Sequence, residues 1–183
     1  MTVHSILIQN SVMAKDVDSL NRFAEAAFDV DNGNVVQLLT KSATAGEGEV
    51  WTATKPASAS LANLYMVAEP EVVIVTAADG TEYKGINADP RNFFTVAGRT
   101  FTAFKLQLGD VVTLTAAAFA NAIAGNTFAN PSDATALLTW GASATASATA
   151  LKLVGTTYIS VGSGTLGATQ RVDAYQLQVV QVA

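Results

Sequence analysis

His4 is the only histidine in the chain, and the sequence contains no cysteine. A serine–histidine–aspartate triad or a histidine-based metal site would therefore have to use His4. No G-x-S-x-G sequence accompanies it to supply a nucleophile, and we expect the segment around it to be mobile. Because thiol catalysis, disulfides and cysteine–zinc sites all need cysteine, we predict no catalytic residue and no enzymatic activity.

Asp29 and Asp31 lie in the sequence DVDNGN, which has the acidic spacing found at the start of some calcium-binding loops. An EF-hand also needs an oxygen ligand at its fifth position, glycine at the sixth and glutamate at the twelfth. Those positions hold Gly33, Asn34 and Thr40. We interpret the stretch as a turn between a helix and a strand and predict no metal site, although a weakly held ion on the two carboxylates stays open.

Gly162, Gly164 and Gly167 have the spacing of the G-x-G-x-x-G motif that binds dinucleotides. That motif requires a strand before it, a helix after it and an acidic residue about 20 positions further on. The segment that follows has the alternation of a strand, and no such acidic residue follows. We therefore expect a connection between two strands and no cofactor.

Two pairs of carboxylates have a spacing that a glycosidase could use, because such an enzyme needs two acids roughly 5–9 Å apart across a cleft. Glu69 and Glu71 would share one face of a strand, and so would Glu47 and Glu49. Adjacent carboxylates are common on protein surfaces. We interpret both pairs as solvated charge.

The sequence NADPRNFF concentrates polar and aromatic side chains in one short loop. Asp89 followed by Pro90 favours a turn. Arg91 can bind a carboxylate through two hydrogen bonds, and Phe93 and Phe94 offer large apolar surfaces. Arginine and aromatic residues are frequent in binding hot spots. Two interpretations stay open: a loop held by the protein's own core, and an interface that anchors a partner.

Trp51 and Trp140 are each flanked by threonine and small residues. Carbohydrate-binding sites use aromatic rings of this kind as stacking platforms, whereas in most proteins such rings pack in the core. We interpret both as core residues and keep a glycan-binding module as an alternative.

Residues 13–28 place their apolar side chains near one face of a helix. Val17, Leu20 and Phe28 belong to that face, and we count them among the candidate interface residues. We predict a short helix in an N-terminal arm that spans residues 1–34. The alternative is an extended arm that becomes ordered only against a neighbouring subunit.

From residue 35 to residue 183, short β-prone runs alternate with turns, and about ten strands are predicted. Asn32-Gly33 and Asp79-Gly80 are turn signals. Strands and helices do not alternate regularly, so a doubly wound parallel sheet is not expected. We predict a mainly β fold, with a single β-sandwich or barrel-like domain over residues 35–183.

Charged residues make up only 14% of the 183 residues, whereas about 25% is typical of soluble domains. Ten basic residues against fifteen acidic ones, with no basic cluster, argue against binding to nucleic acid. No apolar run approaches the ~18 residues of a membrane helix, so no membrane partner is expected either. After Asp110 the charged residues are Asp133, Lys152, Arg171 and Asp173. This low charge favours a protein docked among neighbours, because burying a charge at a contact is costly.

Six blocks of the sequence carry a resemblance: DNGNVVQL, AGEGEVWTAT, EPEVV, YKGINADPRNFFTVAGRTFTAFKLQLGDVVTLT, TYISVGSGTLGATQRV and AYQLQVV. They are similar to blocks in small virion structural proteins of tailed bacteriophages and prophages of Gram-positive bacteria. The resemblance runs from about residue 31 to the C-terminus and transfers no site residues.

The resemblance implies a capsid decoration (cement) protein, or auxiliary head protein, that binds and stabilises the capsid shell. Its implied partners are the major capsid protein and copies of itself, with closed symmetry such as that of a trimer. Its implied location is the capsid surface of the virion, after synthesis in the cytoplasm of the bacterial host. A tail-tube or major capsid component is the alternative within the virion.

Overall fold

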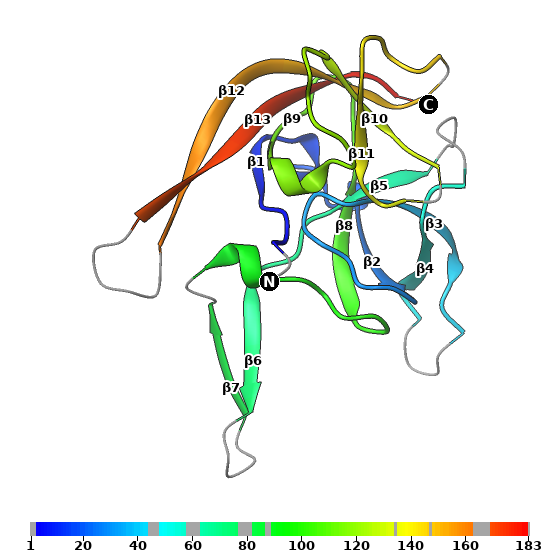
Figure 1. Ribbon diagram of the computed structural model, residues 1–183. Coiled ribbons are helices and arrows are strands. Elements are labelled where there is room, and N and C mark those ends of the chain that lie inside the picture. Colours follow the sequence, from blue (N-terminus) through cyan, green and yellow to red (C-terminus); the bar gives the residue numbers. More distant parts are fainter. Residues whose placement is uncertain are drawn as a thin grey trace.

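The computed structural model describes residues 3–43, 48–57, 63–76, 82–86, 89–133, 135–146, 148–162 and 169–182. Within these residues the chain forms thirteen β-strands and four short 3-10 turns. The strands assemble into a closed barrel, a six-stranded sheet and a two-stranded hairpin (Figure 1). The prediction of a mainly β fold with a barrel-like body is confirmed.

Five strands close the barrel in the order β2-β4-β3-β5-β8. β2 runs parallel to β4, and the other neighbouring pairs are antiparallel. Side chains alternate between the interior and the outer surface, as a closed sheet requires. Val36, Tyr65 and Phe101 are among the residues of the interior cluster. The bounds are β2 Asn21–Ala26, β3 Val35–Lys41, β4 Val50–Thr54, β5 Leu64–Val67 and β8 Thr100–Lys105.

The six-stranded sheet is antiparallel throughout and has the order β1-β9-β13-β12-β10-β11. β1 and β11 are therefore its two edge strands. The bounds are β1 Leu7–Ser11, β9 Val111–Thr115, β10 Phe128–Pro131, β11 Leu138–Gly141, β12 Ala150–Gly162 and β13 Thr169–Gln181.

The main core lies where this sheet covers one side of the barrel. Met66 and Phe104 point out of the barrel and join Leu114, Leu151 and Leu177 of the sheet in one apolar cluster. Each of these five side chains is at most 1% exposed. Because the sheet covers the outer surface of β5, all four residues of that strand, LYMV, are buried and apolar. Burial of this kind is the dominant favourable term in folding.

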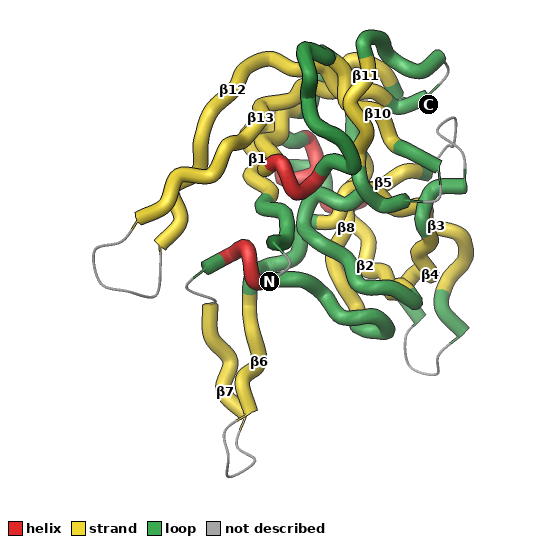
Figure 2. The backbone as a smooth tube through the Cα atoms, in the orientation of Figure 1, coloured by secondary structure: helices red, strands yellow, loops and turns green. Residues whose placement is uncertain are grey.

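Two hairpins extend away from this body (Figures 1 and 2). One consists of β6 Val72–Thr76 and β7 Glu82–Ile86, which pair only with each other. The other, which we call the β12–β13 ribbon, pairs from Ala150 with Gln181 to Gly162 with Thr169. The base of this ribbon belongs to the six-stranded sheet, whereas its far half continues beyond the neighbouring strands.

The helix predicted over residues 13–28 is wrong. Met13–Lys15 and Asp18–Leu20 are separate 3-10 turns, and β2 begins directly after the second. Ala24 and Ala26 are buried while Phe23 is exposed, which is the period of a strand. Pairing with β4 and β8 therefore overrides the helical spacing of the longer segment.

The N-terminal segment predicted to be an arm over residues 1–34 contributes strands to both parts of the body. β1 pairs with β9 of the six-stranded sheet, and β2 lies between β4 and β8 of the barrel. Gly33 follows in a turn, and its backbone N–H donates a hydrogen bond to the carbonyl of Val67. The described part of the segment is thus paired with other strands of the same chain.

Candidate interaction site

The loop from Asp89 to Phe94 is built around a short 3-10 turn, Pro90–Asn92. Asp89 has extended backbone angles and accepts a hydrogen bond from the backbone N–H of Arg91 at 3.0 Å. Pro90 follows it at the first position of the turn, where proline's missing N–H costs nothing. The Asp-Pro sequence therefore specifies this turn locally.

The side chain of Arg91 also binds the carboxylate of Asp89. Its Nε donates to Oδ1 of Asp89 at 2.9 Å, and its Nη2 donates to Oδ2 at 2.7 Å. These hydrogen bonds from Arg91 lower the pKa of the Asp89 carboxyl below its usual 3.8. The remaining nitrogen, Nη1, donates to the side-chain oxygen of Gln170 in β13 at 2.7 Å. Arg91 thus links the loop to the β12–β13 ribbon.

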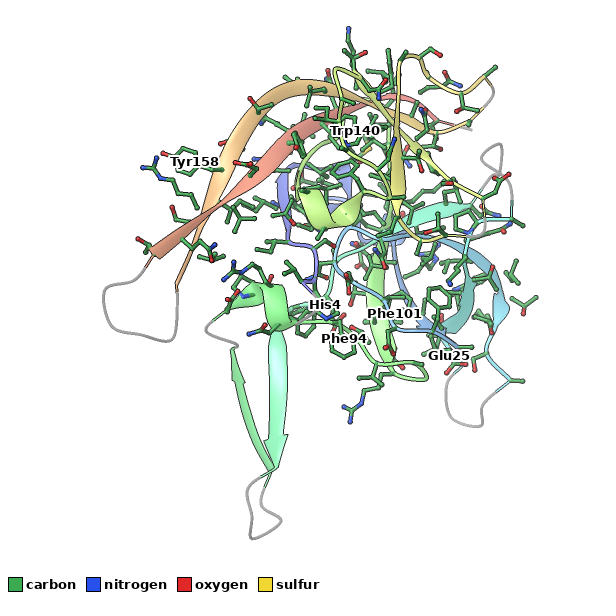
Figure 3. All side chains as sticks on the ribbon, viewed as in Figure 1. His4, Glu25, Phe94, Phe101, Trp140 and Tyr158 are labelled. Atoms are coloured by element: carbon green, nitrogen blue, oxygen red, sulfur yellow. The ribbon has the colours of Figure 1, made fainter. Side chains whose placement is uncertain are left out.

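The two phenylalanines of the loop have different roles. Phe93 is 8% exposed and points into the protein. Phe94 stacks on the ring of His4, with centroids 4.5 Å apart (Figure 3). His4 also donates its backbone N–H to the carbonyl of Arg91 at 2.9 Å. Its Nδ1 lies 2.7 Å from Oδ1 of Asp31.

The structure therefore brings together three segments that are distant in sequence: the N-terminal residues, the Asp89–Phe94 loop and β13. Asp89, Arg91 and Phe94 were predicted as interface residues, and the hydrogen bonds and ring stacking described above join them to other residues of this chain. His4 and Gln170 were not predicted as members of the same cluster. Nothing in the sequence around Gln170 indicates this contact, because it joins residues 79 positions apart.

Val17, Leu20 and Phe28, predicted as further interface residues, do not lie on one face. Val17 is 38% exposed, whereas Leu20 packs against the main core. Phe28 packs against the interior cluster of the barrel, and the ammonium of Lys55 lies 5.1 Å from its ring centroid. Without the helix that was to align them, these residues are separated.

The other motifs also have structural partners. Oδ1 of Asp29 accepts from the N–H of Ala97, while Asp31 binds His4, so the two carboxylates are engaged separately. Among the described residues no group of three histidine, cysteine, aspartate or glutamate side chains could hold a metal ion. Gly164, Gly167 and Glu47 lie outside the described residues.

His4 and Asp31 form an oriented pair whose side chains are 17% and 19% exposed. In the part of the chain that the structure describes, no hydroxyl group is hydrogen-bonded to the histidine ring. Ser5 Oγ, the nearest hydroxyl in sequence, donates instead to the carbonyl of Asn32. The pair therefore anchors the N-terminal residues to the barrel.

Trp140 is 4% exposed and stacks on Phe119 with centroids 4.5 Å apart, while Tyr175 meets both rings edge-on. Asn121 donates to the carbonyl of Trp140 and accepts from its N–H. Trp51 is half-buried against the barrel interior. Trp140 is therefore a core residue, as interpreted from the sequence, whereas Trp51 is only partly buried.

Comparisons with protein-family models, with curated proteins and with solved structures found no match. Within the described residues, no helix is long and apolar enough to cross a membrane.

The β12–β13 ribbon changes its buried face along its length. At the base, Leu177 and Val179 point into the core and are at most 1% exposed. Nearer the tip, Asp173 and Arg171 lie on the same face of β13 as Leu177, but their side chains are exposed. There the opposite face is covered, and Ala174 is fully buried. The twist of a two-stranded ribbon produces this exchange.

Two apolar side chains of β12 are exposed: Val154, at the irregularity in the pairing with β13, and Tyr158, in the far half of the ribbon. Tyr158 is 51% exposed and Val154 is 58% exposed. The guanidinium of Arg171 lies 4.2 Å from the ring centroid of Tyr158. Tyr158 points away from the body in Figure 3. A tyrosine with an adjacent arginine, held on a projecting ribbon, has the composition of a binding hot spot.

Proposed function

We propose that this chain is a bacteriophage virion structural protein, and specifically a capsid decoration protein that binds and stabilises the shell. Its partners are the major capsid protein and further copies of the chain, and its place is the capsid surface. The resemblance of the sequence blocks to those of small head proteins is what supports the family. The observation that supports the mode of action is the projecting β12–β13 ribbon with Tyr158 exposed on it.

Contact with a neighbouring molecule would stabilise a projecting ribbon of this kind. An isolated two-stranded hairpin is marginally stable in water, and a further strand or packing against another element stabilises it. Here the Arg91–Gln170 hydrogen bond holds one side of the ribbon against the body and leaves the Tyr158 face open. Contact of that face with a capsid subunit would bury apolar area on both partners, and many copies would repeat the gain over the shell.

The test is to titrate the purified protein onto expanded capsids that lack it. We expect saturable, stoichiometric binding and a higher temperature of capsid disruption. The variant Tyr158→Ser should bind at least tenfold more weakly while unfolding at the wild-type temperature. Leu39→Thr is the matched control, because Leu39 is 49% exposed on the barrel and should not affect binding.

Each alternative predicts a different result. Assembly of the protein alone into tubes or shells would replace the decoration role by that of a tail-tube or major capsid component. Saturable binding on a glycan array would replace it by that of a glycan-binding module. Absence of binding to expanded capsids would contradict the proposal outright.

A further inference from the structure

A groove of about 570 Å3 runs beside β1, the edge strand of the six-stranded sheet. Leu7, Ile8 and Gln9 of β1 line one side, and residues 68–71, which lead from β5 to β6, line the other. The groove's volume lies within the range of roughly 300–1,000 Å3 that is usual for sites that take small ligands.

Part of the backbone of β1 faces this groove. Ile6 exchanges hydrogen bonds with Thr115: its carbonyl accepts from the Thr115 N–H at 3.2 Å, and its N–H donates to Oγ1 at 2.9 Å. In an antiparallel ladder, alternate residues point their N–H and C=O groups toward the partner strand and away from it. The backbone groups of Leu7 and Gln9 therefore point away from β9, toward the open edge.

One of these outward backbone groups already has a hydrogen-bond partner, Lys15. The ammonium of Lys15 donates to the carbonyl of Gln9 at 2.5 Å, and both residues line the groove. The contact is exposed, so its net contribution to stability is small. Lysine at a sheet edge is a common means of preventing unwanted strand pairing. An incoming strand could displace it, because a backbone N–H offers the same carbonyl a hydrogen bond.

On the opposite side of the groove, hydrogen bonds fix the position of Glu69. The side chain of Asn32 accepts from the N–H of Glu69 at 2.7 Å and donates to its carbonyl at 3.0 Å. The Glu69 carboxylate in turn accepts from the N–H of Thr102 in β8 at 2.7 Å. Three hydrogen bonds therefore tie this side to the barrel, and a ligand would meet a preformed surface.

Glu71 supplies an unmatched charge in the groove. Its carboxylate forms no ion pair or hydrogen bond with any residue that the structure describes, and burial raises its pKa above the usual 4.5. Lys15, the cation among the lining residues, is engaged by Gln9 instead. A carboxylate that is partly desolvated without a partner attracts a cation more strongly than a solvated one does.

We propose that this groove binds an extended, basic segment of a partner protein, which adds to β1 as a further strand. The segment's backbone pairs with the outward groups of Leu7 and Gln9, and its lysine or arginine side chain meets Glu71. Backbone hydrogen bonds supply affinity in such strand addition, and side-chain contacts supply specificity. The inference deepens the proposed function by specifying what the assembly partner presents.

The geometry favours a single extended segment over the edge of a second folded copy. Direct pairing of two β1 strands would bring the sheet edge of one copy into the space bounded by residues 68–71 of the other. A strand attached to its own sheet carries neighbouring strands with it, which that boundary would obstruct. A chain terminus or an unfolded linker has no such neighbours.

The test uses a short fluorescein-labelled peptide that alternates valine with lysine and threonine, and the full-length protein. A peptide with glutamate in place of lysine controls for charge, and one with N-methylated backbone amides controls for strand pairing. Fluorescence anisotropy measures binding. We expect the basic peptide to bind at least tenfold more tightly than either control.

Two substitutions should change this affinity in opposite directions. Glu71→Gln should weaken binding of the basic peptide about tenfold, whereas Lys15→Met should strengthen it severalfold by uncovering the carbonyl of Gln9. Glu49→Gln is the matched control, because Glu49 is 85% exposed and pairs with Lys41 on the barrel. Gln9→Pro removes an outward N–H and no ladder bond, so it should weaken binding while the fold is retained.

Equal binding of the basic and acidic peptides, no binding of the basic peptide, or wild-type affinity of both Glu71→Gln and Gln9→Pro would each overturn the inference. These measurements need no capsids. If the peptide does not bind but the protein still binds capsids, only the inference about the groove is wrong. If the peptide binds but the protein does not bind capsids, the proposed function is wrong and the inference about the groove stands.

Discussion

Arg91 and Gln170 lie 79 positions apart in the chain, and Nη1 of Arg91 donates a 2.7 Å hydrogen bond to the side-chain oxygen of Gln170. The same guanidinium holds both carboxylate oxygens of Asp89. One arginine therefore closes the Asp89–Phe94 loop and attaches it to the β12–β13 ribbon. The contact joins the far half of the ribbon to the body of the protein.

A double-mutant cycle on Arg91→Ala and Gln170→Ala should give a coupling energy of about 0.2–1 kcal/mol, the range for exposed pairs that involve a charged group. Urea denaturation measures it for both single variants and the double variant. Arg99→Ala combined with Gln170→Ala is the control and should be additive, since Arg99 is an exposed arginine for which the structure gives no contact to Gln170. Additivity of the Arg91 cycle would show that the contact does not stabilise the fold.

Acid should weaken the Asp89–Phe94 loop through Asp89. Its folded-state pKa lies below the usual 3.8 because Arg91 donates hydrogen bonds to the ionised form. The resulting stability is fully present above the unfolded-state pKa and is lost as the pH falls through the folded-state value. Asp89→Asn should therefore be less stable than the wild type at neutral pH, and the difference should shrink below pH 3.8.

Thermal unfolding at a series of pH values measures this difference. Asp133→Asn controls for the loss of one negative charge, because Asp133 is exposed. A stability difference between Asp89→Asn and the wild type that stayed constant down to strong acid would be inconsistent with this ion pair.

Glu71 should have the opposite pH dependence. Burial raises its folded-state pKa above 4.5, so the folded state binds a proton more tightly than the unfolded state does. Stability therefore falls as the pH rises from the unfolded-state pKa through the raised folded-state value. Glu71→Gln should be more stable than the wild type at pH 7 in urea denaturation, with the gain disappearing in acid. A less stable variant at pH 7 would indicate a favourable partner for the carboxylate.

Gly33→Ala should destabilise the protein by about 1–3 kcal/mol, the usual range for overpacking and for a strained backbone position. Gly33 has a φ of +87°, and a Cβ placed there would lie 2.4 Å from Cδ2 of Leu114. Leu114 is fully buried and has little room to move. Gly98→Ala separates the two causes, because Gly98 has a φ of +77° but no atom within 4 Å of its Cβ position. Urea midpoints for the two variants should therefore differ, with Gly33→Ala the lower.

Deleting residues 1–30 should abolish folding and not merely remove an arm. The deletion removes β2, which closes the barrel between β4 and β8, and its loss would leave two unpaired edges. Circular dichroism and heteronuclear NMR should show no cooperative native state. Deletion of residues 1–3 is the control and should fold, because it retains His4 and both strands. A folded body after the longer deletion would restore the interpretation of this segment as an arm.

The local turn around Asp89 could be predicted from the sequence, because an Asp-Pro pair specifies its own geometry through a cap and a restricted φ. The sequence did not distinguish the two phenylalanines of the loop, which were both counted as candidate interface residues. Phe93 turns into the core, while Phe94 stacks on His4. No local pattern distinguishes the two rings, since their positions depend on which surface the loop is packed against.

Alternation of apolar residues and the turn signals between runs are local properties, and they determined from sequence alone that this chain is mainly β. They could not determine pairing. β2 lies parallel to β4 and β1 forms an edge because of contacts between residues far apart in the chain, and the helical spacing of residues 13–28 carries no information about those contacts. The tertiary structure alone decided that β2 completes a barrel, that Arg91 reaches the ribbon and that a groove opens beside β1. Burial against the sheet and hydrogen bonding between strands outweigh the small differences in local propensity.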